Sequence, residues 1–368
     1  MRTITIVVAV LLLVCTAAAA QSTLTWTVLA DFQGTKNPSQ PRSIRGLALT
    51  SDDSAIYAGF IQGTSSSAIR YVDTADGDLL GGCTTYVQPK GIATDDRGNF
   101  YATLSDPAGK KVQKFAIFNP SVDSLIGQDI PPSRQFSCAA TSVNAQLAGI
   151  SVSKQGNQYY LYIAHNKGVA TIERWNVTDR DNPFLDTSWA TGGILNLKNL
   201  FGANAYVAGI EVASDGTIYA AGGVQSNTSY GDSVFKIGSD LTTVSSASIL
   251  GAMDVALYGG NVYVTQYLSS NSAIGVFSQS NLSLVDTLYT GIAHPYSLDA
   301  DNGYSGIDID ALGRIYVADQ IYDVRSSNTL CDRILVSSAQ ATAVPEPMSI
   351  VLGIMGVASI AGYRRFRK

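Results

Sequence analysis

The sequence predicts an all-β protein in which six four-stranded units form a ring, and three observations lead to this prediction. The 368-residue chain is rich in glycine (34) and tyrosine (19), and only 14% of its residues are charged. One local pattern recurs six times, and further strand-like segments follow each recurrence. Four-stranded units repeated every 40 to 60 residues are typical of propeller blades. The predicted fold class is therefore a six-bladed β-propeller.

Each repeat has Gly or Asp at its second position, continues with alternating apolar residues, passes a polar turn and ends in a strand that contains Tyr. The repeats occupy residues 45–60, 90–104, 148–164, 208–222, 253–266 and 305–319. The repeated Gly or Asp residues are 45, 58, 60, 45 and 52 residues apart along the chain; they are Gly46, Gly91, Gly149, Gly209, Asp254 and Gly306. Since the pattern itself varies little, we assign the irregular spacing to the connections.

The pattern predicts a hairpin. Alternation such as Ile307-Asp308-Ile309-Asp310 places every second side chain on one face of a sheet. Asp215-Gly216 and Gly259-Gly260 are dipeptides that favour tight turns. A third strand is predicted in each unit, at residues 68–72, 112–115, 170–175, 233–237, 273–277 and 333–336. A fourth strand follows in most units, for example at residues 284–288.

The last unit has no fourth strand before residues 339–343, which form a small-residue linker. Residues 23–31, TLTWTVLAD, read as a strand that has no unit of its own. We predict that this segment completes the last blade and removes an exposed sheet edge. The propeller domain then spans residues 21–338.

The pattern GIDIDALGRIYVAD at residues 306–319, with SDGTIYAAG at 214–222, resembles the NHL family of propeller repeats. The resemblance extends over most of residues 42–338 and implies a propeller ectodomain. The fifth repeat departs from the pattern, because Met253-Asp254 stands where the other repeats have Gly. The alternative is one or two irregular β-sandwiches, which the strand signals after each hairpin disfavour.

The N-terminus reads as a secretory signal peptide over residues 1–20. Arg2 provides the positive start, residues 4–14 are apolar, and residues 17–20 are the small residues of a cleavage zone. A lipoprotein signal ending at Cys15 is the alternative, and the preceding Val14 argues against it. The signal peptide predicts that the protein is exported.

The C-terminal 25 residues combine three features in a fixed order. A proline-rich motif comes first, formed by Val344, Pro345, Glu346 and Pro347. Residues 348–363 then run without a charge, and four cations close the chain: Arg364, Arg365, Arg367 and Lys368. Sixteen helical residues span about 24 Å, slightly less than a bilayer core. The order predicts a transmembrane helix with a cationic membrane stop; the alternative is a terminal helix packed on the domain.

This tail resembles the PEP-CTERM sorting signal of exported bacterial proteins. The resemblance implies that an exosortase is the partner. It also implies that the protein is first anchored in the inner membrane and is then released or transferred by cleavage near the Pro-Glu-Pro motif. It also implies a final location at the cell surface or outside the cell, near extracellular polysaccharide. The removable helix follows the logic of other C-terminal sorting signals.

Acidic residues are predicted to face the central channel. Glu211 and Asp308 stand at equivalent positions of the innermost strands, and Asp254 lies near them by the same register. The matching residues of the other repeats are uncharged, namely Ala48, Ala93, Ser151 and Ala256. Three carboxylates in one channel are candidate ligands for Ca²⁺. This arrangement resembles that of six-bladed sugar-lactone hydrolases, which use such a metal at the mouth of the channel. The alternative is that these acids are hydrated or bonded to backbone amides.

Three cysteines remain after signal removal, which allows one disulfide and one spare thiol. Cys83 and Cys138 are the preferred pair, because both lie in connections that flank one repeat. Three isolated buried thiols are the alternative. The spacing of the cysteines matches no metal-site pattern, and His165 and His294 are expected at the surface or in turns.

The expected function is binding at the cell surface or in the extracellular matrix. The mature chain is mildly acidic without a basic patch, which disfavours nucleic acid as a partner. No motif of a catalytic nucleophile or phosphate loop occurs. We therefore expect a protein that is not an enzyme and whose ligand is polysaccharide or protein. Trp26, Trp175 and Trp189 either stack on sugars or pack within the blades. The alternative function is a lactonase-like, metal-dependent hydrolase that uses the channel acids.

Overall fold

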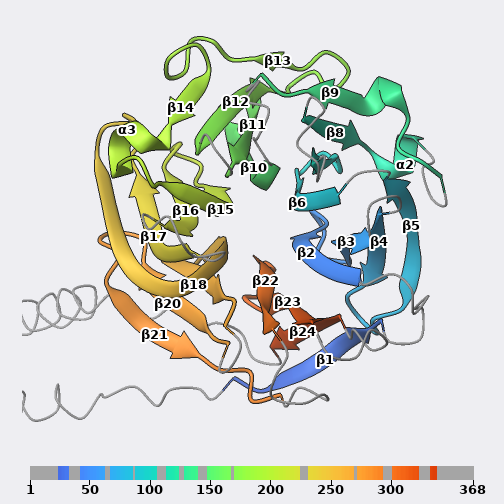
Figure 1. Cartoon of the computed structure of the whole chain (residues 1–368). Coiled ribbons are helices and arrows are strands. Elements are labelled where there is room, and N and C mark those ends of the chain that lie inside the picture. The colour runs from blue at the N-terminus through green and yellow to red at the C-terminus, as the bar shows by residue number, and fades with distance from the viewer. Residues whose placement is uncertain are drawn as a thin grey trace, which may run out of the picture.

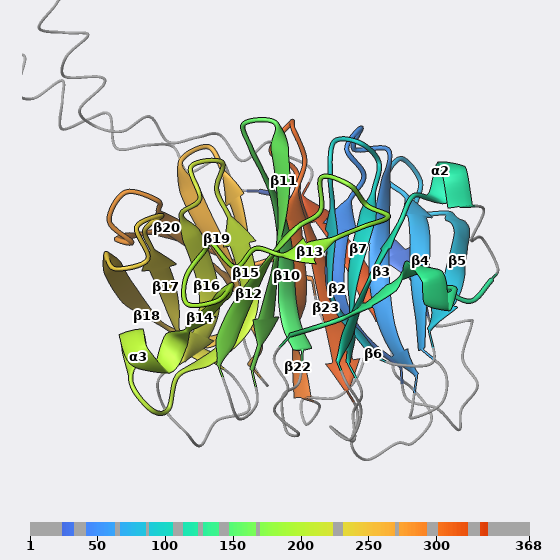
Figure 2. The same cartoon turned by 90° about the horizontal axis from the view of Figure 1, so that it is seen from above.

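The protein is a ring of antiparallel sheets, as the computed structural model in Figure 1 shows. The innermost strands line a central channel. Figure 2 shows the same sheets standing side by side when the ring is turned by 90°. The structure describes residues 24–32, 42–62, 67–85, 88–105, 113–123, 128–139, 147–166, 170–223, 231–268, 272–292, 301–322 and 332–337. The predicted signal peptide, linker, sorting motif and membrane stop lie outside these residues. Within them, no helix is both long and apolar enough to cross a bilayer.

The first three units are separate sheets in which strands follow one another in chain order. The first comprises β2 (Arg42–Leu49), β3 (Ala55–Gln62), β4 (Ser67–Asp73) and β5 (Leu79–Thr85). The second comprises β6 (Gln88–Thr94), β7 (Phe100–Ser105), β8 (Lys114–Phe118) and β9 (Gln135–Ser137). The third comprises β10 (Leu147–Gln155), β11 (Gln158–His165) and β12 (Thr171–Asn176), with β13 (Phe184–Leu185) and β14 (Ile194–Asn196) both paired to β12.

The fourth and fifth units share one long strand, so their strands form a single seven-stranded sheet. The first part of this strand pairs with the fourth unit and its second part with the fifth. The fourth unit comprises β15 (Tyr206–Val212), β16 (Ile218–Gly223), β17 (Gly231–Ile237) and the shared β18 (Val244–Tyr258); β19 (Asn261–Gln266), β20 (Ile274–Ser278) and β21 (Leu284–Leu288) complete the fifth. The described residues also form three one-turn helical segments, namely α2 (Pro120–Asp123), η2 (Pro132–Arg134) and α3 (Leu197–Phe201).

The sixth unit joins both ends of the described chain. It comprises β22 (Asp301–Ile309), β23 (Ile315–Tyr322), β24 (Arg333–Ser337) and β1 (Trp26–Asp31). β1 pairs antiparallel with β24, from Trp26 opposite Ser337 to Asp31 opposite Arg333. The prediction that the N-terminal strand completes the last blade is therefore confirmed. This pairing covers the edge of β24 that would otherwise be open.

The repeated glycines are required where the innermost strands come closest. A Cβ added to Gly91 would lie 2.7 Å from the carbonyl oxygen of Ala148 and 2.8 Å from the amide nitrogen of Ile150. A Cβ added to Gly149 would lie 2.6 Å from the nitrogen of Ile210. The inner hairpin of every unit also shifts register at this point, as expected for β-bulges. The glycines let backbones of neighbouring units touch.

A tyrosine in the second strand of each unit fills the space between that unit and the next. These tyrosines pair with the residue two positions after the repeated Gly or Asp, and all are buried: Tyr57, Tyr101, Tyr162, Tyr219, Tyr263 and Tyr316. The six apolar core clusters each draw residues from two neighbouring units. The hydrophobic core is therefore divided among the six junctions of the ring.

The predicted pair Cys83 and Cys138 does not form a disulfide, since both thiols are free and buried. Cys83 belongs to the cluster between the first and second units, and Cys138 to the cluster between the second and third. The sheet formed by β6–β9 separates these two clusters, because alternate residues of β7 face opposite junctions: Phe100 packs in one and Tyr101 in the other. Within the described residues, the alternative of isolated buried thiols is the one observed.

Replacing Gly91 by Ala is expected to destabilise the ring by about 2–3 kcal/mol, because the new methyl group meets backbone atoms of β10 that cannot move alone. Urea denaturation measures this change. Gly156→Asn is the matched control: Gly156 has φ 63° and open space around its Cβ position, and Asn tolerates this conformation. Equal stabilities of the two variants would contradict the proposed close contact.

Candidate functional site

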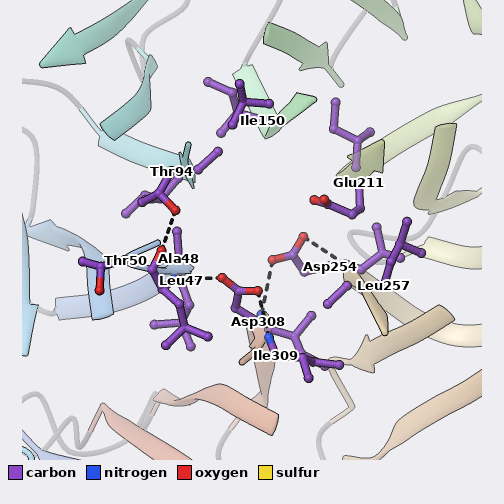
Figure 3. A pocket seen from close by; sticks show the side chains of 18 of the residues that line it. Leu47, Ala48, Thr50, Thr94, Ile150, Glu211, Asp254, Leu257, Asp308 and Ile309 are labelled. Atoms are coloured by element: carbon purple, nitrogen blue, oxygen red, sulfur yellow. Dashed lines mark hydrogen bonds between the residues drawn. The ribbon is translucent and has the colours of Figure 1, made fainter. Parts of the chain in front are cut away.

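The central channel is the candidate functional site. It encloses about 250 Å³ and is walled by the innermost strands of all six units. Aliphatic side chains such as Ile92, Ile150 and Ile210 line much of it, together with three acids. Figure 3 shows that the carboxyl groups of Glu211, Asp254 and Asp308 point toward the same central space.

The acids occupy one half of the channel. Glu211 comes from β15, Asp254 from β18 and Asp308 from β22, so they belong to three successive units. Their equivalence follows from the strand register, since Glu211 stands opposite Tyr219 and Asp308 opposite Tyr316. The corresponding positions in the first two units are Ala48 and Ala93. The predicted placement of the three acids in the channel is therefore observed.

Asp308 and Asp254 each join two neighbouring units. Asp308 Oδ2 accepts a hydrogen bond from the amide of Leu49 (2.8 Å), while its Oδ1 accepts one from the amide of Ile309 (2.8 Å). Asp254 Oδ2 accepts from the amide of Ile307 (3.3 Å), and its Oδ1 from the amide of Val255 (3.0 Å). Both acids are half-buried. Their oxygens hold backbone of the adjacent unit, as the backbone-bonded alternative predicts.

Asp254 also explains why the fifth repeat departs from the glycine pattern. A Cβ added to Gly209 would lie 2.2 Å from Asp254 Oδ1. The carboxyl group of Asp254 thus uses the space that the glycine leaves, and the amide of Asp254 donates to Thr265 Oγ1 (3.0 Å). The replacement of Gly by Asp adds an acceptor between the fifth and sixth units, in the space beside Gly209 of the fourth.

Glu211 is linked to the third unit through Ser151. The Ser151 hydroxyl hydrogen-bonds the Glu211 carboxyl group, and Ser151 Oγ accepts from the amide of Val212 (3.1 Å). Thr94 Oγ1 donates to the carbonyl oxygen of Leu49 and so links the second unit to the first. Polar side chains on the channel wall therefore bridge several of the junctions.

All three acids bind protons more tightly than free carboxylates do. Burial raises the pKa of Asp254 to about 7 and that of Asp308 to about 6, although backbone amides act against this. Burial, followed by the charge of Asp308, raises the pKa of Glu211 well above its ordinary value. The channel can therefore store protons near neutral pH, as acid–base sites do.

The three acids do not meet the geometry of a single-ion site. Among the described residues, one group of three potential ligands has all its ligand atoms within 4.8 Å of one another, and it consists of Cys138, His165 and Glu173. The three channel acids are absent from such a group. The convergence on which the predicted Ca²⁺ site depends is thus not observed.

The cluster of Cys138, His165 and Glu173 lies between the second and third units. His165 is fully buried, so the expectation that it lies at the surface or in a turn is wrong; His294 lies outside the described residues. His165 Nε2 is 3.0 Å from Glu173 Oε1. The cluster was missed because Cys138 follows β9 in one sheet, whereas the other two residues belong to β11 and β12 of the next.

Hydrogen bonds orient Glu173 from both units. Glu173 Oε2 accepts from the amide of Ala139 (3.0 Å) and from the indole nitrogen of Trp175 (2.8 Å). Burial acts to raise the pKa of Glu173, but His165 and these donors bring it below its ordinary value. Burial and the Glu173 charge raise the pKa of Cys138 well above its ordinary value. A protonated, buried thiol is not a nucleophile.

The tryptophans pack within the ring. Trp26 and Trp189 are buried, and the ring of Trp175 contacts Phe115 with centroids 5.0 Å apart. These contacts support the packing alternative over exposed sugar-stacking surfaces.

In the loop at residues 179–183, Asp179 accepts hydrogen bonds from the amide of Asp181 (3.0 Å) and from the side chain of Asn182 (2.9 Å), as in an Asx turn.

The four-stranded antiparallel sheets around a channel define the protein as a β-propeller. No protein-family model and no curated protein matches the chain.

Similar solved structures include the β-propeller domain of Cps50 (Swd1) from Myceliophteria thermophila, at 12% identity and TM-score 0.43, covering 81% of this chain and 84% of that one. A nidogen/laminin complex has 16% identity and TM-score 0.44, covering 67% and 80%. Hydrazine synthase of Kuenenia stuttgartiensis has 14% identity and TM-score 0.47, covering 82% and 80%. At these identities the likeness concerns the fold alone.

The replacement Asp254→Asn is expected to change the pH dependence of stability. Because the folded-state pKa of Asp254 is about 7 and the ordinary value is 3.8, the native state binds more protons over this range. Wild-type stability from this group is therefore lost as pH rises toward 7 and above. We expect the free energy of unfolding of the variant, relative to wild type, to increase by about 2 kcal/mol from pH 5 to pH 8.

Urea denaturation at the two pH values measures this difference. Asp215→Asn, in the exposed turn between β15 and β16, is the control and should show little change with pH. A difference between Asp254→Asn and wild type that does not vary with pH would show that this carboxyl group titrates normally.

Proposed function

We propose that this chain is an exported, NHL-like six-bladed propeller that acts as a non-enzymatic binding protein at the cell surface or in the extracellular matrix. The signal peptide at residues 1–20 and the PEP-CTERM-like tail at residues 344–368 support export and sorting by an exosortase. The ligand is a polysaccharide or a surface protein, contacted through the propeller loops. The membrane holds the chain through residues 348–363 until processing.

The observation that carries the non-enzymatic proposal is the use of the channel acids. Asp254 and Asp308 each accept two backbone hydrogen bonds, and one of these comes from a neighbouring unit. Groups that hold two blades together cannot reorient around a substrate without loosening the ring. The channel acids therefore suit a structural role in a rigid scaffold, with binding left to the surface.

The second candidate function is a metal-dependent, lactonase-like hydrolase. One observation favours it: three carboxyl groups with raised pKa values share one channel, and perturbed acids gather at functional sites. In this reading Glu211, Asp254 and Asp308 would hold Ca²⁺ after leaving their amide partners, and the ion would polarise a lactone carbonyl.

Deleting residues 344–368 is expected to leave a folded propeller that is exported but no longer held at the membrane, because the apolar helix and its cationic end are gone. Fractionation of the native host, with intact mass measurement of both forms, tests this. The full-length chain should appear first in the membrane fraction and later as a form cut near Pro345–Pro347. The control replaces Arg180, outside the tail, by Gln. A full-length chain that stays in the cytoplasm would refute the sorting proposal.

Calcium distinguishes the two functions. If the protein is a binding protein without a channel Ca²⁺ site, Ca²⁺ at about 5 mM should move the unfolding midpoint by less than about 1 °C. A ligand raises the midpoint only when it binds the folded state. For the hydrolase, Ca²⁺ should raise the midpoint, and Glu211→Gln should remove the rise. Differential scanning calorimetry with and without chelator measures the shift. A rise that depends on Glu211 would replace the binding proposal by the hydrolase.

A further inference from the structure

The buried cluster of Cys138, His165 and Glu173 has no role in the proposed binding function. The exposed fractions of the three residues are 5%, 0% and 0%. All three bear groups that bind transition metals, and one ligand atom from each lies within 4.8 Å of the other two. Such a set of thiol, imidazole and carboxyl is unusual in an apolar junction, where Phe115, Leu147 and neighbouring side chains form the walls.

The imidazole of His165 is incompletely satisfied within the described part of the chain. Its Nε2 lies 3.0 Å from Glu173, yet neither ring nitrogen makes a hydrogen bond of acceptable geometry. Leaving a buried polar nitrogen without a partner costs about 1–3 kcal/mol. A ring nitrogen that coordinates a cation would remove this cost, so the histidine points to a ligand.

The charges favour a divalent ion. A thiolate and a carboxylate together carry two negative charges, and one divalent cation would make the buried site neutral with a neutral imidazole. Neutrality matters here because an unpaired charge in a low-dielectric environment is costly. Thiolate, imidazole and carboxylate are the three ligand types of protein zinc sites, whereas Ca²⁺ takes oxygen ligands.

The geometry suits a tetrahedral ion. With Zn–ligand distances of about 2.0–2.3 Å, ligand atoms at two corners of a tetrahedron are about 3.3–3.8 Å apart. The cluster lies within the 4.8 Å limit, and its Nε2 to Oε1 distance is 3.0 Å. Small side-chain shifts therefore place all three atoms around one ion, with the fourth position left to water or another group.

The surroundings of Glu173 provide the outer contacts that metal ligands need. The amide of Ala139 and the indole of Trp175 both donate to Oε2, which fixes the carboxyl group with Oε1 toward His165. Metal-bound carboxylates are held by such hydrogen bonds, whose loss weakens binding by about 10–100-fold.

A cysteine-dependent catalytic triad is the competing interpretation of the same three side chains. It requires that a substrate reach the sulfur atom. Cys138 and its partners are closed in the junction between two sheets, and a substrate cannot enter without opening the ring. A metal ion, by contrast, can be enclosed when the sheets assemble, because binding of a structural ion is coupled to folding.

We propose that Cys138, His165 and Glu173 bind one zinc ion that clamps the second and third blades together. Cys138 follows β9 of the second unit, whereas His165 ends β11 and Glu173 lies in β12 of the third. The ion would therefore connect the two blades at this junction, as hydrogen bonds of the channel acids connect blades at other junctions. The ligand class is a borderline-soft divalent transition metal, with zinc as the resident ion.

The test is refolding of the purified chain from denaturant in the presence of a thiol reductant and either Co²⁺, Zn²⁺ or a chelator. Co²⁺ reports on thiolate ligation through its charge-transfer absorption. We expect about one Co²⁺ per chain with thiolate absorption, and a higher unfolding midpoint with Zn²⁺ than with chelator.

Variants identify the ligands. Cys138→Ala should abolish the thiolate absorption and weaken binding by more than about 100-fold, since a direct ligand matters more than an outer contact. Cys83→Ala and Cys331→Ala are the controls and should keep the absorption. Trp175→Phe keeps an aromatic side chain but loses the indole nitrogen that donates to Glu173, so binding should weaken by about 10-fold.

Several results would overturn the proposal. Wild-type protein that refolds to the same stability with chelator and retains no metal has no such site. Absorption that survives in Cys138→Ala but disappears in Cys83→Ala or Cys331→Ala would place the thiolate elsewhere. If Cys138→Ala fails to fold, the metal content, thiolate absorption and midpoint of the wild-type protein decide the question.

Discussion

The close approach of six backbones around the channel is the constraint on which the structure depends. At the junctions through Gly91 and Gly149, any side chain would come within 3 Å of the neighbouring strand. The β-bulge at each of these points turns the inner strand, and the tyrosine in the second strand fills the junction outside it. The repeat pattern is thus the local chemistry of one junction, repeated around the ring.

The channel acids follow from the same constraint. Backbone amides on the channel wall need acceptors when strands of different blades are not paired with one another. Asp308 and Asp254 supply them to Leu49 and Ile307. As a consequence, the carboxyl groups of Asp254 and Asp308 have raised pKa values, which are also common in active sites. Raised pKa values therefore have a structural cause here, namely burial at blade junctions.

In our interpretation, two kinds of contact hold neighbouring units together, namely hydrogen-bonded acids and a bound metal ion. Acids bridge the third unit to the fourth, the fifth to the sixth and the sixth to the first, whereas the proposed zinc ion would bridge the second and third. Pairing of β1 with β24 closes the ring by backbone hydrogen bonds. This pairing covers the edge of β24, which could otherwise pair with another chain.

The sequence by itself determined the hairpins, their order and the strand that closes the ring. These features depend on local alternation, turn residues and the period-two geometry of strands, which neighbouring residues encode. It also placed Glu211, Asp254 and Asp308 in the channel, because one register repeats in every unit. The proposed sorting tail rests on sequence alone and lies outside the described residues.

Only the tertiary structure decided the state of the cysteines and histidine. Cys83 and Cys138 are close in chain order around one unit but face opposite junctions, because a single sheet lies between them. Cys138 instead meets His165 and Glu173, which belong to the next sheet. Contacts between sheets depend on how edge strands are placed across a junction. That placement is a property of the closed ring, and no local pattern in the chain encodes it.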